Sequence, residues 1–225
     1  MTRKAVISVT LAFLTLGVMT RRATAAGAEP APYYLFYLHG RIVEDKGPEA
    51  VSPEHGLYDY RANCRALEAR GFVVRSEVRP FGTTAEYGEK IASEVRELLG
   101  KGVPASHITI AGHSKGGMLT WVAAASLGNP DLRFAIMAGC GKDGDDDLTA
   151  RAPKIKGHVL SIVDESDTVC GPCKSFFARN ADVDLTEIVT KTGLGHGLFY
   201  RPRPEWLDPL EAFAKAGERS SAAAR

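Results

Sequence analysis

The sequence predicts a single α/β domain in which helices cover both faces of a mostly parallel sheet of about six strands. Short apolar runs alternate with longer amphipathic segments along most of the chain, which is the pattern of a parallel sheet flanked by helices. The 225 residues are enough for one domain with an ordinary hydrophobic core. Neither an internal repeat nor an interdomain linker interrupts the alternation.

Six apolar runs are predicted to form the strands, and four amphipathic segments to form helices. The strands are expected at residues 33–38, 72–78, 108–111, 132–137, 159–163 and 185–189. The helices are expected at residues 58–70, 85–99, 118–127 and 204–213. The predicted domain therefore covers residues 33–217, between a short linker at 26–32 and a flexible Ser/Ala-rich tail at 218–225.

The N-terminus has the pattern of a secretory signal peptide over residues 1–25. A basic segment at 2–4 precedes an apolar run at 5–20, and small residues at 23–25 offer a cleavage site. The apolar run is shorter than the ~20 residues that a spanning helix needs. Arg21 and Arg22 follow the apolar run and disfavour cleavage by a signal peptidase, so an uncleaved membrane anchor is the alternative. We expect a periplasmic or secreted protein, without stable membrane insertion if the peptide is removed.

The charge balance excludes no substrate class but gives no reason to expect a polyanionic partner. Lys and Arg together number 28, against 27 for Asp and Glu. A protein that binds nucleic acid normally presents an excess of positive charge. We therefore expect no nucleic-acid partner.

The strongest motif is the G-x-S-x-G pattern formed by Gly112, Ser114 and Gly116, between a predicted strand and a predicted helix. In a nucleophile elbow the serine stands on a strained turn, and small residues two positions away on either side let the backbone pass. The start of the following helix also directs backbone N–H groups toward the site. The alternative interpretation is a glycine-rich turn without catalytic function.

Three further segments accompany this motif in a fixed order along the chain. His39-Gly40-Arg41 follows the first predicted strand, Asp164-Glu-Ser-Asp167 follows the fifth, and Gly193-Leu-Gly-His196-Gly follows the sixth. Together with the serine motif they resemble the α/β-hydrolase superfamily, and in particular its small lidless esterases and dienelactone hydrolase. The resemblance covers nearly the whole chain after the signal peptide.

The resemblance implies a three-layer α/β-hydrolase fold and a serine hydrolase that cleaves a small-molecule ester through an acyl-enzyme. Ser114 would be the nucleophile, His196 the general base and Asp167 the acid that orients the histidine, with Asp164 as the fallback acid. The alternative interpretation of Asp164 is an acidic loop residue solvated at the end of the strand. The backbone N–H groups of Arg41 and Lys115 would form the oxyanion hole. No cofactor is implied.

The chain departs from the usual pattern in two places. The first two strands of the fold are missing, because only a short polar stretch precedes residue 33. The segment at 140–158, where relatives insert a lid, is short, so we expect no lid domain and an open site. Within it, residues 143–147 lack the spacing of a calcium loop and are interpreted as a solvated turn, so no metal site is expected.

Arg41 and Glu44 follow the first predicted strand and could meet the substrate at the mouth of the site. Arg41 could favour an anionic ester, while an ordinary surface ion pair between the two residues is the alternative.

The four cysteines are Cys64, Cys140, Cys170 and Cys173, and in an exported protein they favour disulfides. Three connectivities are possible, and spacing does not choose among them. Cys170-Gly-Pro-Cys173 resembles the active site of thioredoxin-type oxidoreductases, which makes thiol-disulfide exchange an alternative function. Because the fold context differs, we interpret Cys170–Cys173 as a structural disulfide. A non-catalytic binding protein on a hydrolase fold is the third class considered.

Overall fold

The computed structural model describes residues 31–141 and 145–216. The predicted signal peptide, most of the predicted linker and the predicted C-terminal tail lie outside the described residues.

Six parallel strands form the central sheet, in the order β4-β1-β5-β6-β7-β8. The strands are β1 (Tyr33–Leu38), β4 (Phe72–Arg75), β5 (Ile108–His113), β6 (Arg133–Met137), β7 (Gly157–Asp164) and β8 (Val183–Thr190). A separate two-stranded antiparallel hairpin joins β2 (Val51–Ser52) to β3 (Gly56–Leu57). The predicted fold class is confirmed, although the hairpin was not expected.

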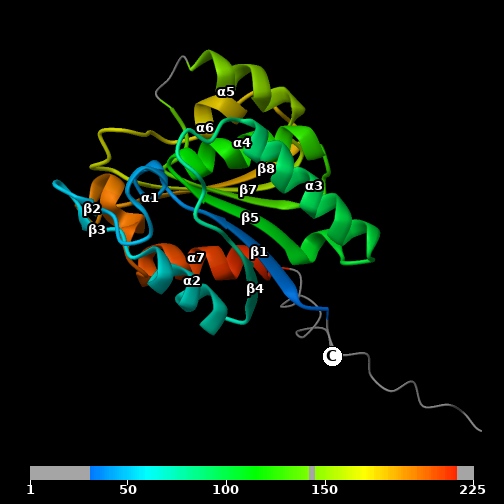
Figure 1. The fold of residues 1–225 in the computed structure, drawn as a ribbon. Coiled ribbons are helices and arrows are strands. Elements are labelled where there is room, and N and C mark those ends of the chain that lie inside the picture. Colours follow the sequence, from blue (N-terminus) through cyan, green and yellow to red (C-terminus); the bar gives the residue numbers. More distant parts are fainter. Residues whose placement is uncertain (1–30, 142–144, 217–225) are drawn as a thin grey trace, which may run out of the picture. The chain divides into compact units, whose positions relative to one another are not determined.

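Helices cover both faces of this sheet (Figure 1). The helices are α1 (Arg41–Lys46), α2 (Tyr60–Ala69), α3 (Glu86–Gly100), α4 (Lys115–Leu127), α5 (Asp146–Arg151), α6 (Lys174–Phe177) and α7 (Pro204–Ala214). The short 3-10 helices are η1 (Ala105–His107), η2 (Ala152–Lys154) and η3 (Gly195–Tyr200). Residues of α2 and α7 pack into one core cluster, and residues of α3, α4, α5 and α6 pack into the other.

The two core clusters follow from the alternation of side chains along each strand. In β1, Leu35 and Tyr37 face the cluster under α2 and α7, whereas Phe36 and Leu38 face the cluster under α3 and α4. Every residue of β5 is buried, as expected for a central strand that is covered on both faces.

The strand register gathers several loops at one edge of the sheet. Leu38 pairs with Gly112, His113 with Met137, and Met137 with Ile162, so the carboxyl ends of β1, β5, β6 and β7 lie beside one another. The chain moves outward from β1 to β4 and then returns to place β5 on the other side of β1. In an open α/β sheet, the crevice at such a reversal is where ligands bind.

The segment at 140–158 differs in detail from the expected solvated turn. Asp145 accepts a hydrogen bond from the N–H of Leu148 at 3.0 Å and caps α5, so Asp146 and Asp147 belong to a helix. Leu148 and Ala152 are buried against the core beneath. Residues 142–144 lie outside the described part of the chain.

Within the described residues, no helix is both long and apolar enough to cross a membrane.

Candidate active site

Ser114 lies on a strained turn between β5 and α4. Its backbone has φ 56° and ψ −121°, a conformation that L-residues rarely adopt. The neighbouring glycines permit this turn, because a Cβ on Gly112 would lie 2.1 Å from the carbonyl oxygen of Gly116. A Cβ on Gly116 would lie 2.0 Å from the carbonyl oxygen of Leu38. The predicted requirement for small residues on both sides of the serine therefore has a direct steric cause.

His196 faces Ser114 from η3. Its Nε2 lies 2.9 Å from Ser114 Oγ, across 82 residues of sequence. The His196 side chain is 11% exposed, and its imidazole packs against the buried ring of His113, with the ring centroids 4.8 Å apart. Gly195, at φ 53°, lets the chain turn immediately before the histidine.

Asp167 binds the other nitrogen of the same imidazole. Its Oδ2 lies 2.9 Å from His196 Nδ1, and its side chain is fully buried. Its Oδ1 accepts hydrogen bonds from the backbone N–H groups of Val169 and Cys170. Burial alone would raise the pKa of the Asp167 carboxyl, but the hydrogen bonds from His196 and Cys170 outweigh it and hold the pKa below its usual value. An ionised Asp167 accepts from Nδ1–H, which leaves Nε2 free to accept the proton of Ser114.

Asp164 has a different place from the one expected for a fallback acid or a solvated loop residue. It is 1% exposed, and its carboxylate accepts hydrogen bonds from the N–H and hydroxyl groups of Ser166, Thr190, Thr192 and Gly195. Burial would raise its pKa, but these bonds lower it well below the usual value. Asp164 thus ties the loop that carries Asp167 to the loop that carries His196, and the solvated-loop interpretation was wrong.

The segment after β1 lies next to the serine turn. Arg41 is the first residue of α1 and Lys115 is the first residue of α4, so each has a backbone N–H at a helix start. The preceding residue, Gly40, donates its N–H to the buried hydroxyl of Tyr58 at 3.2 Å. Tyr58 also lies within hydrogen-bond distance of Tyr37 and His113. This role of Tyr58 was not predicted, because Tyr58 belongs to no recognisable sequence motif.

Solved structures of known proteins have the same arrangement of strands and helices. SOBER1 of Arabidopsis thaliana has a TM-score of 0.56 and 14% identity, over 83% of this chain and 99% of that one. An esterase of Rhizomucor miehei has a TM-score of 0.57 and 15% identity, over 85% and 76% of the two chains. The hyperthermophilic esterase of Pyrobaculum calidifontis has a TM-score of 0.56 and 17% identity, over 83% and 77%. The chain has the α/β-hydrolase fold. No protein-family model matches the sequence, and no curated protein matches it.

In this α/β-hydrolase fold, Glu44 does not lie at the mouth of the site. Its side chain is 1% exposed and forms ion pairs with Arg79 and Lys115. The expected alternative, a surface pair between Arg41 and Glu44, is also absent, because Arg41 pairs with Asp45 at 3.3 Å. The cause is helical geometry: on α1, Arg41 and Asp45 share the exposed face, while Glu44 points inward. The Arg41 side chain is 69% exposed, and its preference for anionic esters stays a prediction.

The predicted Cys170–Cys173 disulfide was wrong. Cys173 is bonded to Cys140, with the two Cα atoms 5.4 Å apart, while Cys64 and Cys170 are free thiols. Cys140 and Cys173 both pack in the cluster under α3 and α4, whereas Cys170 packs against the opposite cluster. The two cysteines of the C-x-x-C motif therefore pack against different core clusters.

This arrangement also argues against thiol-disulfide exchange. Burial and the adjacent Asp167 carboxylate raise the pKa of the Cys170 thiol to about 12, so the reactive thiolate is disfavoured. The partner sulfur that a C-x-x-C mechanism needs is bonded to Cys140 instead.

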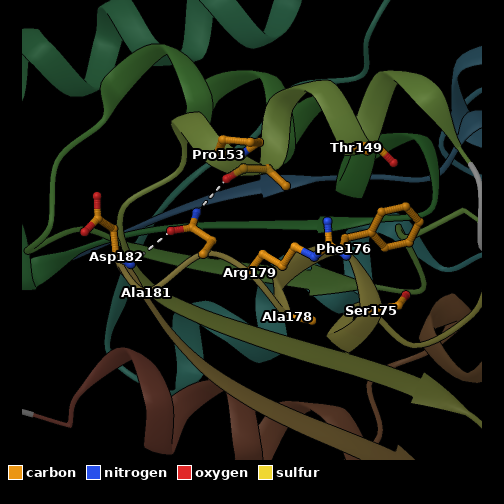
Figure 2. A pocket seen from close by; sticks show the side chains of 10 residues that line it. Thr149, Pro153, Ser175, Phe176, Ala178, Arg179, Ala181 and Asp182 are labelled. Atoms are coloured by element: carbon orange, nitrogen blue, oxygen red, sulfur yellow. Dashed lines mark hydrogen bonds between the residues drawn. The ribbon is translucent and has the colours of Figure 1, made fainter.

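Two sizeable hollows lie in the surface of the described part of the chain. The larger, of about 910 Å³, is lined by residues of α5, η2, α6 and the segment that follows it (Figure 2). Asn180 is one of the lining residues and donates hydrogen bonds to the carbonyl oxygens of Ala152 and Ile155. The second, of about 450 Å³, lies between the β2–β3 hairpin and the histidine loop and includes His55 and Tyr200. Ser114 lines neither of them.

Across residues 31–141 and 145–216, no group of three or more His, Cys, Asp or Glu side chains is arranged to hold a metal ion.

Proposed function

We propose that this protein is a serine hydrolase that cleaves a small carboxylic ester through an acyl-enzyme intermediate. The observation that carries the proposal is the chain of contacts from Ser114 Oγ to His196 Nε2 and from His196 Nδ1 to Asp167 Oδ2, each 2.9 Å. A serine hydroxyl is a weak nucleophile, and an adjacent base that accepts its proton activates it. The two contacts match the geometry that this chemistry requires.

In the proposed reaction, Ser114 Oγ attacks the ester carbonyl while its proton passes to His196 Nε2. The C–O bond to the alcohol then breaks, and His196 returns the proton to the leaving alkoxide. Water attacks the acyl-enzyme by the same route in reverse, with His196 again taking and giving the proton. Asp167 stays ionised throughout and stabilises the imidazolium that forms twice in the cycle.

Negative charge develops on the carbonyl oxygen in both steps. We assign its stabilisation to the backbone N–H groups of Arg41 and Lys115, which stand at the starts of α1 and α4 on either side of the serine turn. Removing one such donor typically costs 10²–10³ in kcat in enzymes of this type.

The context of the site supports this proposal. Two of the similar structures are named as esterases, although identities of 15–17% carry the fold alone. The Cys140–Cys173 disulfide fits an oxidising compartment, in agreement with the export predicted from residues 1–25. We therefore place the activity in the periplasm or outside the cell.

A fluorophosphonate label and a panel of p-nitrophenyl esters test the proposal together. Wild-type protein should be labelled at Ser114 and should hydrolyse at least one ester. Ser114→Ala should lose the label and lower kcat by on the order of a million-fold, and His196→Ala should do the same, because the triad acts as a unit. Asp167→Asn should cost on the order of 10⁴. Near-normal turnover in either of the first two variants would contradict the assignment.

A further inference from the structure

A buried cluster of charges lies behind the segment that follows β1, and the proposed mechanism does not use it. Its centre is the carboxylate of Glu44, whose side chain is 1% exposed. Oε1 accepts hydrogen bonds from Lys115 Nζ at 2.5 Å and from the backbone N–H of Thr83 at 3.0 Å. Oε2 lies 3.5 Å from Arg79 Nε. One carboxylate therefore joins α1, the start of α4 and the loop after β4.

Stability alone does not account for charges at this place. Removing ions from water costs several kcal/mol each, and well-packed apolar side chains can often replace a buried ion pair without loss. The cluster is not even fully satisfied, because Glu44 Oε2 and two guanidinium nitrogens of Arg79 lack a hydrogen-bond partner among the described residues. What the ions provide here is a defined geometry between three segments of chain.

Arg79 extends the same cluster to His39, the first residue of the segment that carries the predicted oxyanion donor Arg41. Its Nη2 donates to the carbonyl oxygen of His39 at 2.5 Å, and its backbone N–H donates to His39 Nε2 at 3.0 Å. Burial and the positive charge of Arg79 lower the pKa of His39 to about 3, so the imidazole is neutral and Nε2 can accept. The other nitrogen, Nδ1, then donates to the carbonyl oxygen of Gly40 at 2.8 Å.

Two of the three segments that the cluster joins, α1 and the start of α4, supply the proposed oxyanion donors. Arg41 carries one donor, and Glu44 follows three residues later on the same helix. Lys115 carries the other donor on its backbone, while its side chain reaches across to Glu44. An oxyanion hole works only when both N–H groups stand about 2.7–3.1 Å from the position of the developing oxyanion. The distance between the starts of α1 and α4 therefore affects how well the transition state is stabilised.

We propose that Glu44 is a positioning residue for the oxyanion hole. Through Lys115 and Arg79 its carboxylate holds the backbone N–H groups of Arg41 and Lys115 at the spacing that the transition state requires. Glu44 itself does not touch the substrate, and the Lys115 ammonium is occupied by Glu44 rather than offered to a substrate anion. The inference rests on the proposed function, since it needs a reaction at Ser114.

The test compares kcat, KM and the inhibition constant of a trifluoromethyl ketone, which forms an oxyanion on binding, among variants of the mature enzyme. Glu44→Gln and Lys115→Met each remove the ion pair. Lys115→Arg keeps it and should rescue activity. Asp45→Asn is the matched control, because it removes the exposed ion pair of the same helix, that of Arg41 with Asp45. Melting temperatures are measured in parallel.

Glu44→Gln and Lys115→Met should each lower kcat by about 10-fold or more and raise the inhibition constant of the ketone by a similar factor. KM should change less than about 3-fold, because only transition-state binding is affected. The double variant should be no worse than either single one, since both break one interaction. Asp45→Asn should stay within about 2-fold of wild type, and Lys115→Arg should recover much of the activity that Lys115→Met loses. If Glu44→Gln does not fold, Lys115→Met gives the same comparison, because its side chain is 25% exposed.

A Glu44→Gln or Lys115→Met enzyme with a lower melting temperature but wild-type kcat and ketone affinity would overturn the inference, because that is the mark of a merely structural ion pair. A raised KM at unchanged kcat would overturn it as well. Wild-type protein without Ser114-dependent hydrolysis would overturn the proposed function and this inference together, whereas a fully active Glu44→Gln enzyme would overturn only the inference.

Discussion

Two carboxylates lie three residues apart at the end of β7, Asp164 as its last residue and Asp167 in the loop that follows, and their surroundings give them different tasks. Asp167 has one oxygen on His196 and the other on two backbone N–H groups, so it presents a fixed acceptor to the imidazole. Asp164 makes no contact with His196 in the hydrogen bonds of the described residues, but it binds the loop on which His196 stands. One residue orients the base directly, and the other holds the two loops together.

The stability contribution of Asp164 should depend on pH. Its pKa in the folded state is depressed, so the unfolded chain binds the proton more tightly, and folding favours the ionised form. The contribution is therefore complete above the unfolded pKa of about 4 and is lost as the pH falls through the folded-state value. Asp164→Asn should lower the melting temperature at pH 7 by about 5 °C or more, because the new amide places a donor among donors. The gap to wild type should shrink below about pH 4.

Melting curves from pH 3 to pH 7 provide the measurement, with Glu165→Gln as the control. Glu165 is the adjacent residue, its side chain is 52% exposed, and its ion pair with Lys191 lies at the surface. That variant should melt within about 1 °C of wild type. An Asp164→Asn protein that melts like wild type at pH 7 would mean that the hydrogen bonds to Asp164 do not hold these loops.

Sequence motifs could predict those site residues that have a characteristic spacing from their neighbours. Ser114 and His196 follow from the glycines around them and from the order of motifs, and the structure brings both together with Asp167. Asp164 and Glu44 could not be assigned in this way. Whether an acidic side chain after a strand or on a short helix is solvated or buried depends on partners such as Thr192 and Arg79, which are distant in sequence.

At the scale of elements, the longer helices and the strands were predicted and the short elements were not. The predicted helix at 85–99 corresponds to α3, Glu86–Gly100, and the first strand was predicted with its observed bounds. Helices α1, α5 and α6 contain six, six and four residues, too few to show a period of 3.6. The cysteine pairing was missed for a related reason, because the approach of the segment after β6 to the loop after β7 is a tertiary contact.

The Cys140–Cys173 disulfide should brace these two segments against unfolding. It closes a loop with a sequence separation of 33 residues, for which the chain-entropy argument gives about 3–4 kcal/mol. Replacing both cysteines by alanine should lower the melting temperature by roughly 10 °C while kcat changes little, since both sulfurs belong to the core cluster under α3 and α4. Cys170→Ala should melt close to wild type, because Cys170 is a free thiol.

Alkylation followed by intact-mass measurement checks the pairing independently. Unfolded but unreduced protein should take up two alkyl groups, on Cys64 and Cys170, and reduced protein should take up four. A cross-linked peptide that joins Cys170 to Cys173 would contradict the observed connectivity.

At the scale of the molecule, the sheet places each part of the proposed machinery at one edge. The loops after β1, β5, β7 and β8 carry the oxyanion segment, the serine, the acid and the histidine, and parallel strands bring these loops to the same end. That convergence could be predicted, because parallel strands joined by right-handed crossovers leave few other topologies. Among the described residues the sheet ends at β4 on one side, and β1 separates β4 from the nucleophile strand β5.

The range of substrates should depend on which segments cover the carboxyl ends of the strands near Ser114. The described part of the segment between β6 and β7 forms α5 and η2, which pack against the core under α4 instead of extending over the serine. Ser114 lines neither of the hollows of about 910 and 450 Å³, and Lys115 beside it lines only a smaller one of about 140 Å³. We therefore expect little room for a long acyl chain, whose binding energy would then be unavailable to the transition state.

Short esters should therefore be the better substrates. For p-nitrophenyl esters of increasing acyl length, kcat/KM should be highest at roughly two to four carbons and should then level off or fall, because added methylenes stay in water in both the ground state and the transition state. The measurement is kcat/KM from acetate to decanoate below the micelle concentration of each ester, with the slow hydrolysis by Ser114→Ala subtracted. A steady rise of about threefold or more for each pair of methylenes would show that a long apolar pocket exists, because burying methylenes beside the reacting carbonyl is what produces such a rise.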